Sequence, residues 1–126
     1  KGRESRTHYR VLQRLRGHTF VAVRLDTGRT HQIRVHMTHI KYPILGDQLY
    51  GGRLAIPKKL DEETREMLIH FKRQALHAFR LTFMHPVSHE MISLTSPIPN
   101  DMEFMIIALS GHGLDSKTIN EFNYPE

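Results

Sequence analysis

The chain has 126 residues, enough for one small domain, and its 18 lysines and arginines against 13 acids give a net charge of +5. The last fourteen residues carry −2, which leaves +7 on the rest and favours an anionic partner, most simply nucleic acid. The sequence has no cysteine and no apolar run of about eighteen residues, which excludes disulfides, thiol catalysis, cysteine-ligated zinc and a spanning segment and favours a cytoplasmic protein.

Two strands are expected first. Residues 7–12 alternate imperfectly between polar and apolar side chains, and residues 20–25 (FVAVRL) alternate with a period of two. Gly17-His18 separates the two segments, so an antiparallel hairpin is predicted. Asp26-Thr27-Gly28 then has the composition of a turn.

A short helix is predicted after this turn. Ile33, Met37 and Ile40 recur at i, i+4 and i+7, Thr30 stands where an N-cap belongs, and Pro43 ends the pattern. The free N–H groups at the start of such a helix attract anions.

Three basic side chains lie at this predicted helix start: Arg29, His31 and Arg34. The planar fork of arginine suits a phosphate or a carboxylate, so the turn is a candidate anion site. The alternative is a solvated basic turn in which Arg34 pairs with a structural carboxylate, and the residues alone leave both open.

The second half of the chain predicts two helices around a second hairpin. Asp61 can cap a polar helix to about His70, residues 75–84 and 91–96 form strands around a turn at 86–89, and Asn100 with Glu103 forms a capping box before an apolar helix. Residues 111–126 form a polar tail that we expect to be poorly ordered unless it packs on a neighbour. This order predicts an α+β fold, mainly an antiparallel sheet with short helices packed on it.

Several other chemistries find little support in the sequence. His36 and His39 are spaced i, i+3, but no third ligand or HExxH pattern accompanies them, so structural histidines are the better interpretation. No phosphate-binding glycine loop or GxSxG elbow occurs. Asp47 is a possible acid near the site and is better interpreted as a turn residue.

Three segments together resemble a known family: TGRTHQIRVHMTHIKYPILGDQLYGG, RQALHAFRLTFMHP and SPIPNDM. In this order they resemble the bacterial ribosomal large-subunit pseudouridine synthases of the RluA/RluD family, closest to the synthase D branch. The likeness covers residues 5 to 110. It implies that residues 1–110 are the C-terminal portion of a pseudouridine synthase catalytic domain.

The resemblance implies isomerisation of uridine to pseudouridine in RNA, on a stem-loop of the large ribosomal RNA, with no metal or organic cofactor. The target nucleotide is flipped from its stack, and an aspartate of an upstream HRLD-type motif acts on it. That motif is absent here, so we expect a fragment that is inactive without the N-terminal half of its catalytic domain.

Residue roles follow from the same resemblance. Arg34 matches the basic partner of the absent aspartate, and Leu76 matches a position near the flipped base. Substrate contacts are also expected from four neighbouring residues: Arg29, Thr30, His31 and Gln32. Lys41 and His89 depart from the family pattern, since glycine is usual at both positions.

Two functions compete on this evidence. The first is the C-terminal part of an RNA pseudouridine synthase, with an exposed sheet edge or apolar face where the missing half docks. The second is a non-catalytic RNA-binding module that retains the pocket motifs for shape and charge, and that would bind RNA in a salt-sensitive way without activity.

Overall fold

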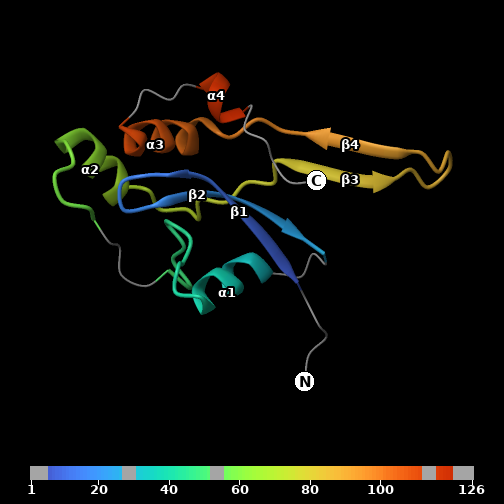
Figure 1. Ribbon diagram of the computed structural model, residues 1–126, viewed down its shortest axis with the longest axis horizontal. Coiled ribbons are helices and arrows are strands. Elements are labelled where there is room, and N and C mark those ends of the chain that lie inside the picture. Colours follow the sequence, from blue (N-terminus) through green and yellow to red (C-terminus); the bar gives the residue numbers. More distant parts are fainter. Residues whose placement is uncertain (1–5, 27–30, 52–55, 112–115, 121–126) are drawn as a thin grey trace.

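The computed structural model describes residues 6–26, 31–51, 56–111 and 116–120 (Figure 1). The elements, in order, are β1 (Thr7–Arg14), β2 (Thr19–Leu25), α1 (Gln32–His39), α2 (Glu62–Ile69), β3 (Arg80–Met84), β4 (Met91–Thr95), α3 (Asn100–Ser110) and α4 (Ser116–Asn120). The strands form two separate two-stranded antiparallel sheets. The predicted α+β class is confirmed, with the antiparallel pairing divided between two hairpins.

The first hairpin is the centre of the molecule. Thr7 of β1 lies opposite Leu25 of β2 and Arg14 lies opposite Thr19, with one irregularity between Val11 and Gln13. In Figure 1, α1 lies below this hairpin and α3 lies above it. The N-terminal hairpin predicted from the alternating pattern is therefore confirmed, and it carries helices on both sides.

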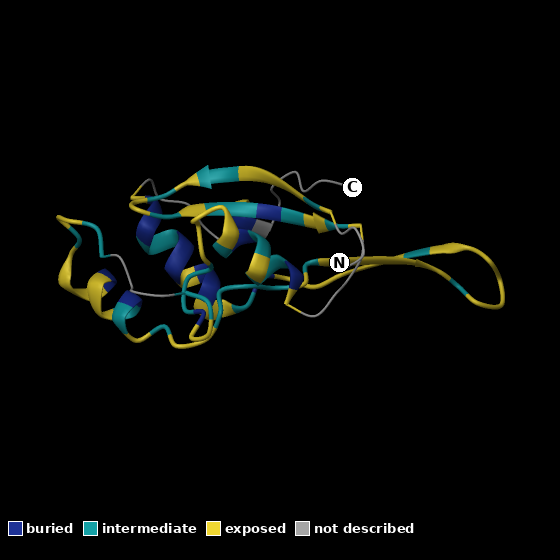
Figure 2. Ribbon diagram, turned by 90° about the horizontal axis from the view of Figure 1, so that it is seen from below, coloured by how far each residue is buried: buried dark blue, intermediate teal, exposed yellow. Residues whose placement is uncertain are grey.

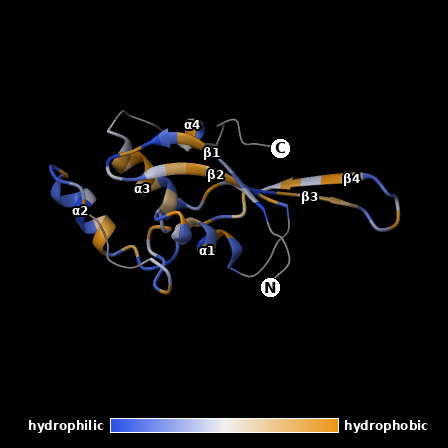
Figure 3. Ribbon diagram, turned by 60° about the horizontal axis from the view of Figure 1, so that its bottom comes forward, coloured by the Kyte–Doolittle hydropathy of each residue, from blue (hydrophilic) through white to orange (hydrophobic). Residues whose placement is uncertain are grey.

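The core gathers around α3, which Figure 2 shows as the most buried helix and Figure 3 as mostly apolar. One face of α3 packs with the loop before it and with α4; the buried residues of this cluster are Ile98, Met102, Ile106 and Ile119. A second face of α3 packs against α2, and the buried residues of this second cluster are Leu68, Met105 and Leu109. No helix in the described residues is long and apolar enough to cross a bilayer.

Part of the predicted polar tail belongs to this core. Ile119 of α4 is 0% exposed and packs with Met102 and Ile106 of α3. Residues 116–120 meet the condition set for order in the tail, because they pack on a neighbouring element through the buried Ile119. Of the remaining tail positions, Gly111 is the C-cap of α3 and the others lie outside the described residues.

The two predicted helix caps have different outcomes. Asp61 caps α2 as expected, since its carboxylate accepts hydrogen bonds from the backbone N–H (3.1 Å) and the hydroxyl (2.7 Å) of Thr64. The prediction of a capping box at Asn100 is wrong. Pro99 is the N-cap of α3, without a side-chain bond, and Asn100 is already helical, so its side chain does not cap the helix.

The second hairpin is shorter than predicted and projects from the body as an arm (Figures 1 and 2). The strand expected over residues 75–84 begins only at Arg80, because Ala75 donates its backbone N–H to Leu45 and Phe79 packs against the core. The apolar side chains of β3 are largely exposed: Leu81 is 61% and Phe83 is 38% exposed.

An exposed apolar arm and unpaired strand edges match what the fragment hypothesis expects. Each described strand pairs with one neighbour only, so each sheet has open edges. Cross-strand pairs such as Leu81 with Leu94 and Phe83 with Ile92 bring apolar side chains together along the arm. That another part of a longer protein covers them stays a prediction.

Lys41 and His89, where the family resemblance places glycine, both have left-handed backbone, with φ of 71° and 63°. A side chain in this region is strained, so Lys41→Gly and His89→Gly are each expected to raise stability by about 0.5 kcal/mol, after the entropic cost of glycine. Thermal unfolding measures the change. Lys58→Gly, at an exposed position without positive φ, should lower the melting temperature, and equal losses in all three variants would contradict the argument.

Candidate active site

Arg34 is the third residue of α1, and its side chain is held in a fixed orientation. Its Nε donates to Oδ2 of Asp47 at 2.9 Å, and its Nη2 donates to Oδ1 at 2.8 Å. The Arg34 side chain is 15% exposed and the Asp47 side chain is 0% exposed. A two-bonded fork of this kind fixes direction as well as distance, because both partners are planar.

Asp47 combines the ion pair with the turn role expected for it. It follows Gly46, and its Oδ1 accepts hydrogen bonds from the backbone N–H groups of Leu49 and Tyr50, both at 3.0 Å. The Arg34 guanidinium, and then these N–H groups, hold the pKa of the Asp47 carboxyl far below its usual range, although burial opposes the shift. The carboxylate therefore remains ionised.

Tyr50 lies over the guanidinium. The Cζ of Arg34 is 5.0 Å from the Tyr50 ring centroid, a cation–π distance. The ring also meets the His31 ring edge-on, with centroids 5.9 Å apart and planes at 75°, and its hydroxyl lies 3.5 Å from Nδ1 of His31. His31, Arg34, Asp47 and Tyr50 thus form one cluster, which we call the Asp47 cluster.

The helix start differs from the prediction. The N-cap of α1 is His31, not Thr30, and it has left-handed backbone with φ of 62° and no side-chain cap. Histidine tolerates this conformation better than most residues. Arg29 and Thr30, both predicted to contact substrate, lie outside the described residues.

Gln32 is tied to the first strand. It is 5% exposed, and its Nε2 donates to the backbone carbonyl of Arg6 (3.0 Å) and to the hydroxyl of Thr7 (3.1 Å). These bonds anchor the first turn of α1 on β1 and so position Arg34. A contact between Gln32 and RNA stays a prediction.

Leu76 lies on a separate, larger feature. A groove of about 1490 Å³ is lined by the first hairpin, α1 and the loop after it, the end of α2, residues 75–82 and α3, and both Leu76 and Asp47 line it. Arg34 and His31 are not among its lining residues. Asp47 is therefore the residue that the groove and the guanidinium share, and the role of Leu76 beside a flipped base stays a prediction.

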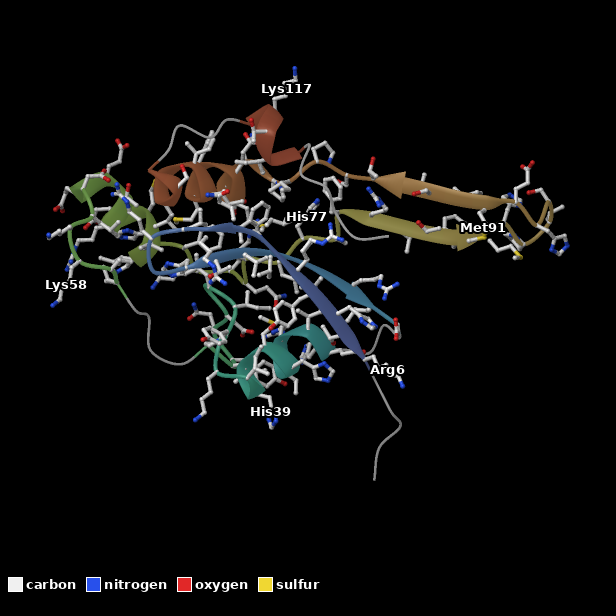
Figure 4. All side chains as sticks on the ribbon, in the orientation of Figure 1. Arg6, His39, Lys58, His77, Met91 and Lys117 are labelled. Carbon is white, nitrogen blue, oxygen red and sulfur yellow. The ribbon has the colours of Figure 1, made fainter. Side chains whose placement is uncertain are left out.

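The histidine pair on α1 does not converge on one site. The His36 ring bonds the hydroxyl of Thr7, while His39 points away from the hairpin (Figure 4). Within the described residues, no group of three or more side chains is placed to hold a metal ion.

The low pKa of Asp47 predicts a pH dependence of stability. A carboxyl whose folded pKa is depressed stabilises the fold above its unfolded pKa, about 4, and this contribution is lost as the pH falls further. Urea unfolding at a series of pH values should show this loss as a fall in the free energy of unfolding. Asp47→Asn should make the free energy of unfolding depend less steeply on pH below about pH 4. Asp26, Asp61 and Asp101, whose pKa values are also lowered, contribute to the slope that remains. An unchanged slope in Asp47→Asn would contradict the assignment.

Comparison with known proteins identifies the family. A sequence profile described as RNA pseudouridylate synthase matches residues 1–39. Ribosomal large subunit pseudouridine synthase D of Vibrio cholerae is 53% identical over 108 residues, which are 86% of this chain and 33% of the relative. Its namesake in Xanthomonas campestris is 54% identical with the same shares, and that of Haemophilus influenzae is 46% identical over 98% of this chain and 37% of the relative. The chain belongs to the pseudouridine synthase family.

The chain spans about a third of the length of the curated relatives it matches. Of its predicted site residues, the structure brings His31 and Arg34 together and places Leu76 on the neighbouring groove. Sequence reasoning missed Tyr50 and did not pair Asp47 with Arg34. The one signal for both was their place in LGDQLYGG, soon after the helix that carries Arg34.

Proposed function

We propose that this chain is part of an RNA pseudouridine synthase that isomerises uridine to pseudouridine in large-subunit ribosomal RNA. The observation that carries the proposal is identity of about half over 86% of the chain to proteins named ribosomal large subunit pseudouridine synthase D. The net charge of +5 is consistent with an RNA partner. We expect the protein to act in the cytoplasm.

In the proposed reaction the target nucleotide leaves its stack, the glycosidic C–N bond breaks, and the base rotates and rejoins the sugar through carbon. An aspartate from an HRLD-type motif outside these 126 residues acts on the nucleotide. Arg34 pairs with that aspartate and keeps it ionised through charge-assisted hydrogen bonds. We expect Arg29, Thr30, His31 and Gln32 to meet RNA and Leu76 to pack near the base, and residues 1–126 alone to be inactive.

The full-length protein should be tested on large-subunit ribosomal RNA from a strain that lacks its gene. Pseudouridine forms at a defined position if the proposal is right, and carbodiimide labelling with primer extension or mass spectrometry detects it. Salt-sensitive RNA binding with no pseudouridine would reject the enzyme and favour the non-catalytic RNA-binding module.

A further inference from the structure

Asp47 has more partners in the candidate site than a turn requires. Its buried carboxylate accepts two hydrogen bonds from Arg34 and one each from the backbone N–H groups of Leu49 and Tyr50. Two of these bonds shape the loop after α1, and two reach back to the helix. One side chain therefore fixes where the guanidinium lies relative to the Tyr50 ring.

The bonds to Asp47 also decide which part of Arg34 remains available. A guanidinium can form a two-bonded fork with a carboxylate along its side edge, through Nε and one terminal nitrogen, or along its end edge, through the two terminal nitrogens. Asp47 occupies the side edge, through Nε and Nη2. Within the described residues, no carboxylate lies on the end edge, which includes Nη1.

We propose that Asp47 is a positioning residue that holds the side edge of Arg34 and so presents the end edge to the aspartate that acts on the uridine. This inference rests on the proposed function, because it needs the second carboxylate that the reaction requires. Asp47 touches neither substrate nor the reacting atoms in this arrangement and acts through Arg34 alone.

The charges of the Asp47 cluster are consistent with Asp47 holding one edge of Arg34 while the other edge orients the reacting aspartate. Asp47 stays ionised because Arg34 and two N–H groups stabilise its charge, so the Arg34–Asp47 pair is neutral as a whole. A neutral pair attracts a second carboxylate weakly through net charge, and its selectivity comes from the direction of the free N–H groups. If the free N–H groups of Arg34 lose their orientation, the reaction should therefore slow more than RNA binding weakens.

Tyr50 and His31 connect the position of Asp47 to one face of the Arg34 guanidinium. The backbone of Tyr50 is bonded to Asp47, its ring lies 5.0 Å from the Arg34 Cζ, and its hydroxyl approaches His31. Movement of the Asp47 carboxylate would shift the ring that covers one face of the guanidinium. The positioning effect thus includes a face of Arg34 as well as an edge.

The test uses the full-length protein with Asp47→Asn, which keeps the shape and one oxygen acceptor but breaks the fork. The matched control is Asp101→Asn, because Asp101 makes the same two-bonded contact with Arg73, at 2.7 Å, on an exposed surface. Ile119→Val, in the core and outside both the Asp47 cluster and the groove, controls for loss of stability. The readouts are the single-turnover rate at saturating RNA, the Kd for RNA and the Arg34 Nε–H NMR signal.

We expect Asp47→Asn to slow the single-turnover rate about tenfold to a hundredfold and to shift the Arg34 signal, with RNA affinity and both controls nearly unchanged. Arg34→Lys keeps the charge but has no second edge, so it should slow the reaction similarly even if Asp47→Asn fails to fold. Wild-type rates in either variant would overturn the inference and leave the proposed function standing. If the wild-type protein itself forms no pseudouridine, the proposed function fails and the inference with it.

Discussion

Arg34→Ala in the full-length protein is expected to lower the single-turnover rate of pseudouridine formation by about a hundredfold or more. In the proposed reaction, Arg34 supplies the charge-assisted bonds that keep the reacting aspartate ionised and oriented. Its loss also leaves the Asp47 carboxylate, which is 0% exposed, with only backbone N–H partners. A buried charge without its partner destabilises a fold, so the melting temperature should fall as well.

Arg73→Ala provides the matched control for this variant. Arg73 makes the same fork, with Asp101, and its guanidinium lies 5.6 Å from the Phe71 ring centroid, so the chemistry of the two arginines is alike. The Arg73 pair is 43% and 48% exposed, however, and exposed pairs contribute little. Arg73→Ala should keep the rate and nearly the stability. Equal rates for Arg34→Ala and wild type would remove Arg34 from the reaction.

Repeating patterns made the elements predictable. The period-two alternation of residues 20–25 gave β2, and the spacing of Ile33, Met37 and Ile40 gave α1, because alternation and helical spacing each have one simple structural solution. Residues 75–79 were also predicted as strand, but Ala75 bonds to Leu45, Phe79 packs on the core, and His77 and Phe79 bond to Ser96 just after β4, so the predicted strand was too long. Pairing between distant segments decides such cases, and a local pattern does not contain it.

The candidate site was predictable only in part for the same reason. Arg34 was found through the GRTHQIR motif and its place on a helix. Its partner Asp47 is thirteen residues away, and an ion pair across a loop depends on the loop conformation. The residues considered alone allowed Arg34 to pair with a structural carboxylate, and Asp47 is that carboxylate. The motif alone identified the arginine but not the geometry that holds it.

The conformation of this loop depends on Gly46. Gly46→Ala is expected to destabilise the protein by about 3 kcal/mol. Gly46 has φ of 78°, a conformation that costs alanine about 1–2 kcal/mol. An added Cβ would also overlap the backbone carbonyl of Arg73, which cannot rotate away as a side chain can. The loop is held there because Ala75 donates its N–H to the Leu45 carbonyl at 2.8 Å.

Gly111→Ala separates the two causes. Gly111 has φ of 64°, close to that of Gly46, but its Cβ would meet the end of the Arg16 side chain, which can move. Chemical unfolding should give a loss of about 1 kcal/mol for Gly111→Ala, so the excess in Gly46→Ala measures the clash with Arg73. Because Gly46 directly precedes Asp47, relief of that clash by movement of the loop would also pull the carboxylate away from Arg34. Gly46→Ala should therefore lose activity at temperatures where it remains folded, whereas Gly111→Ala should not. Equal stability losses in the two variants would mean that the loop yields freely and does not fix Asp47.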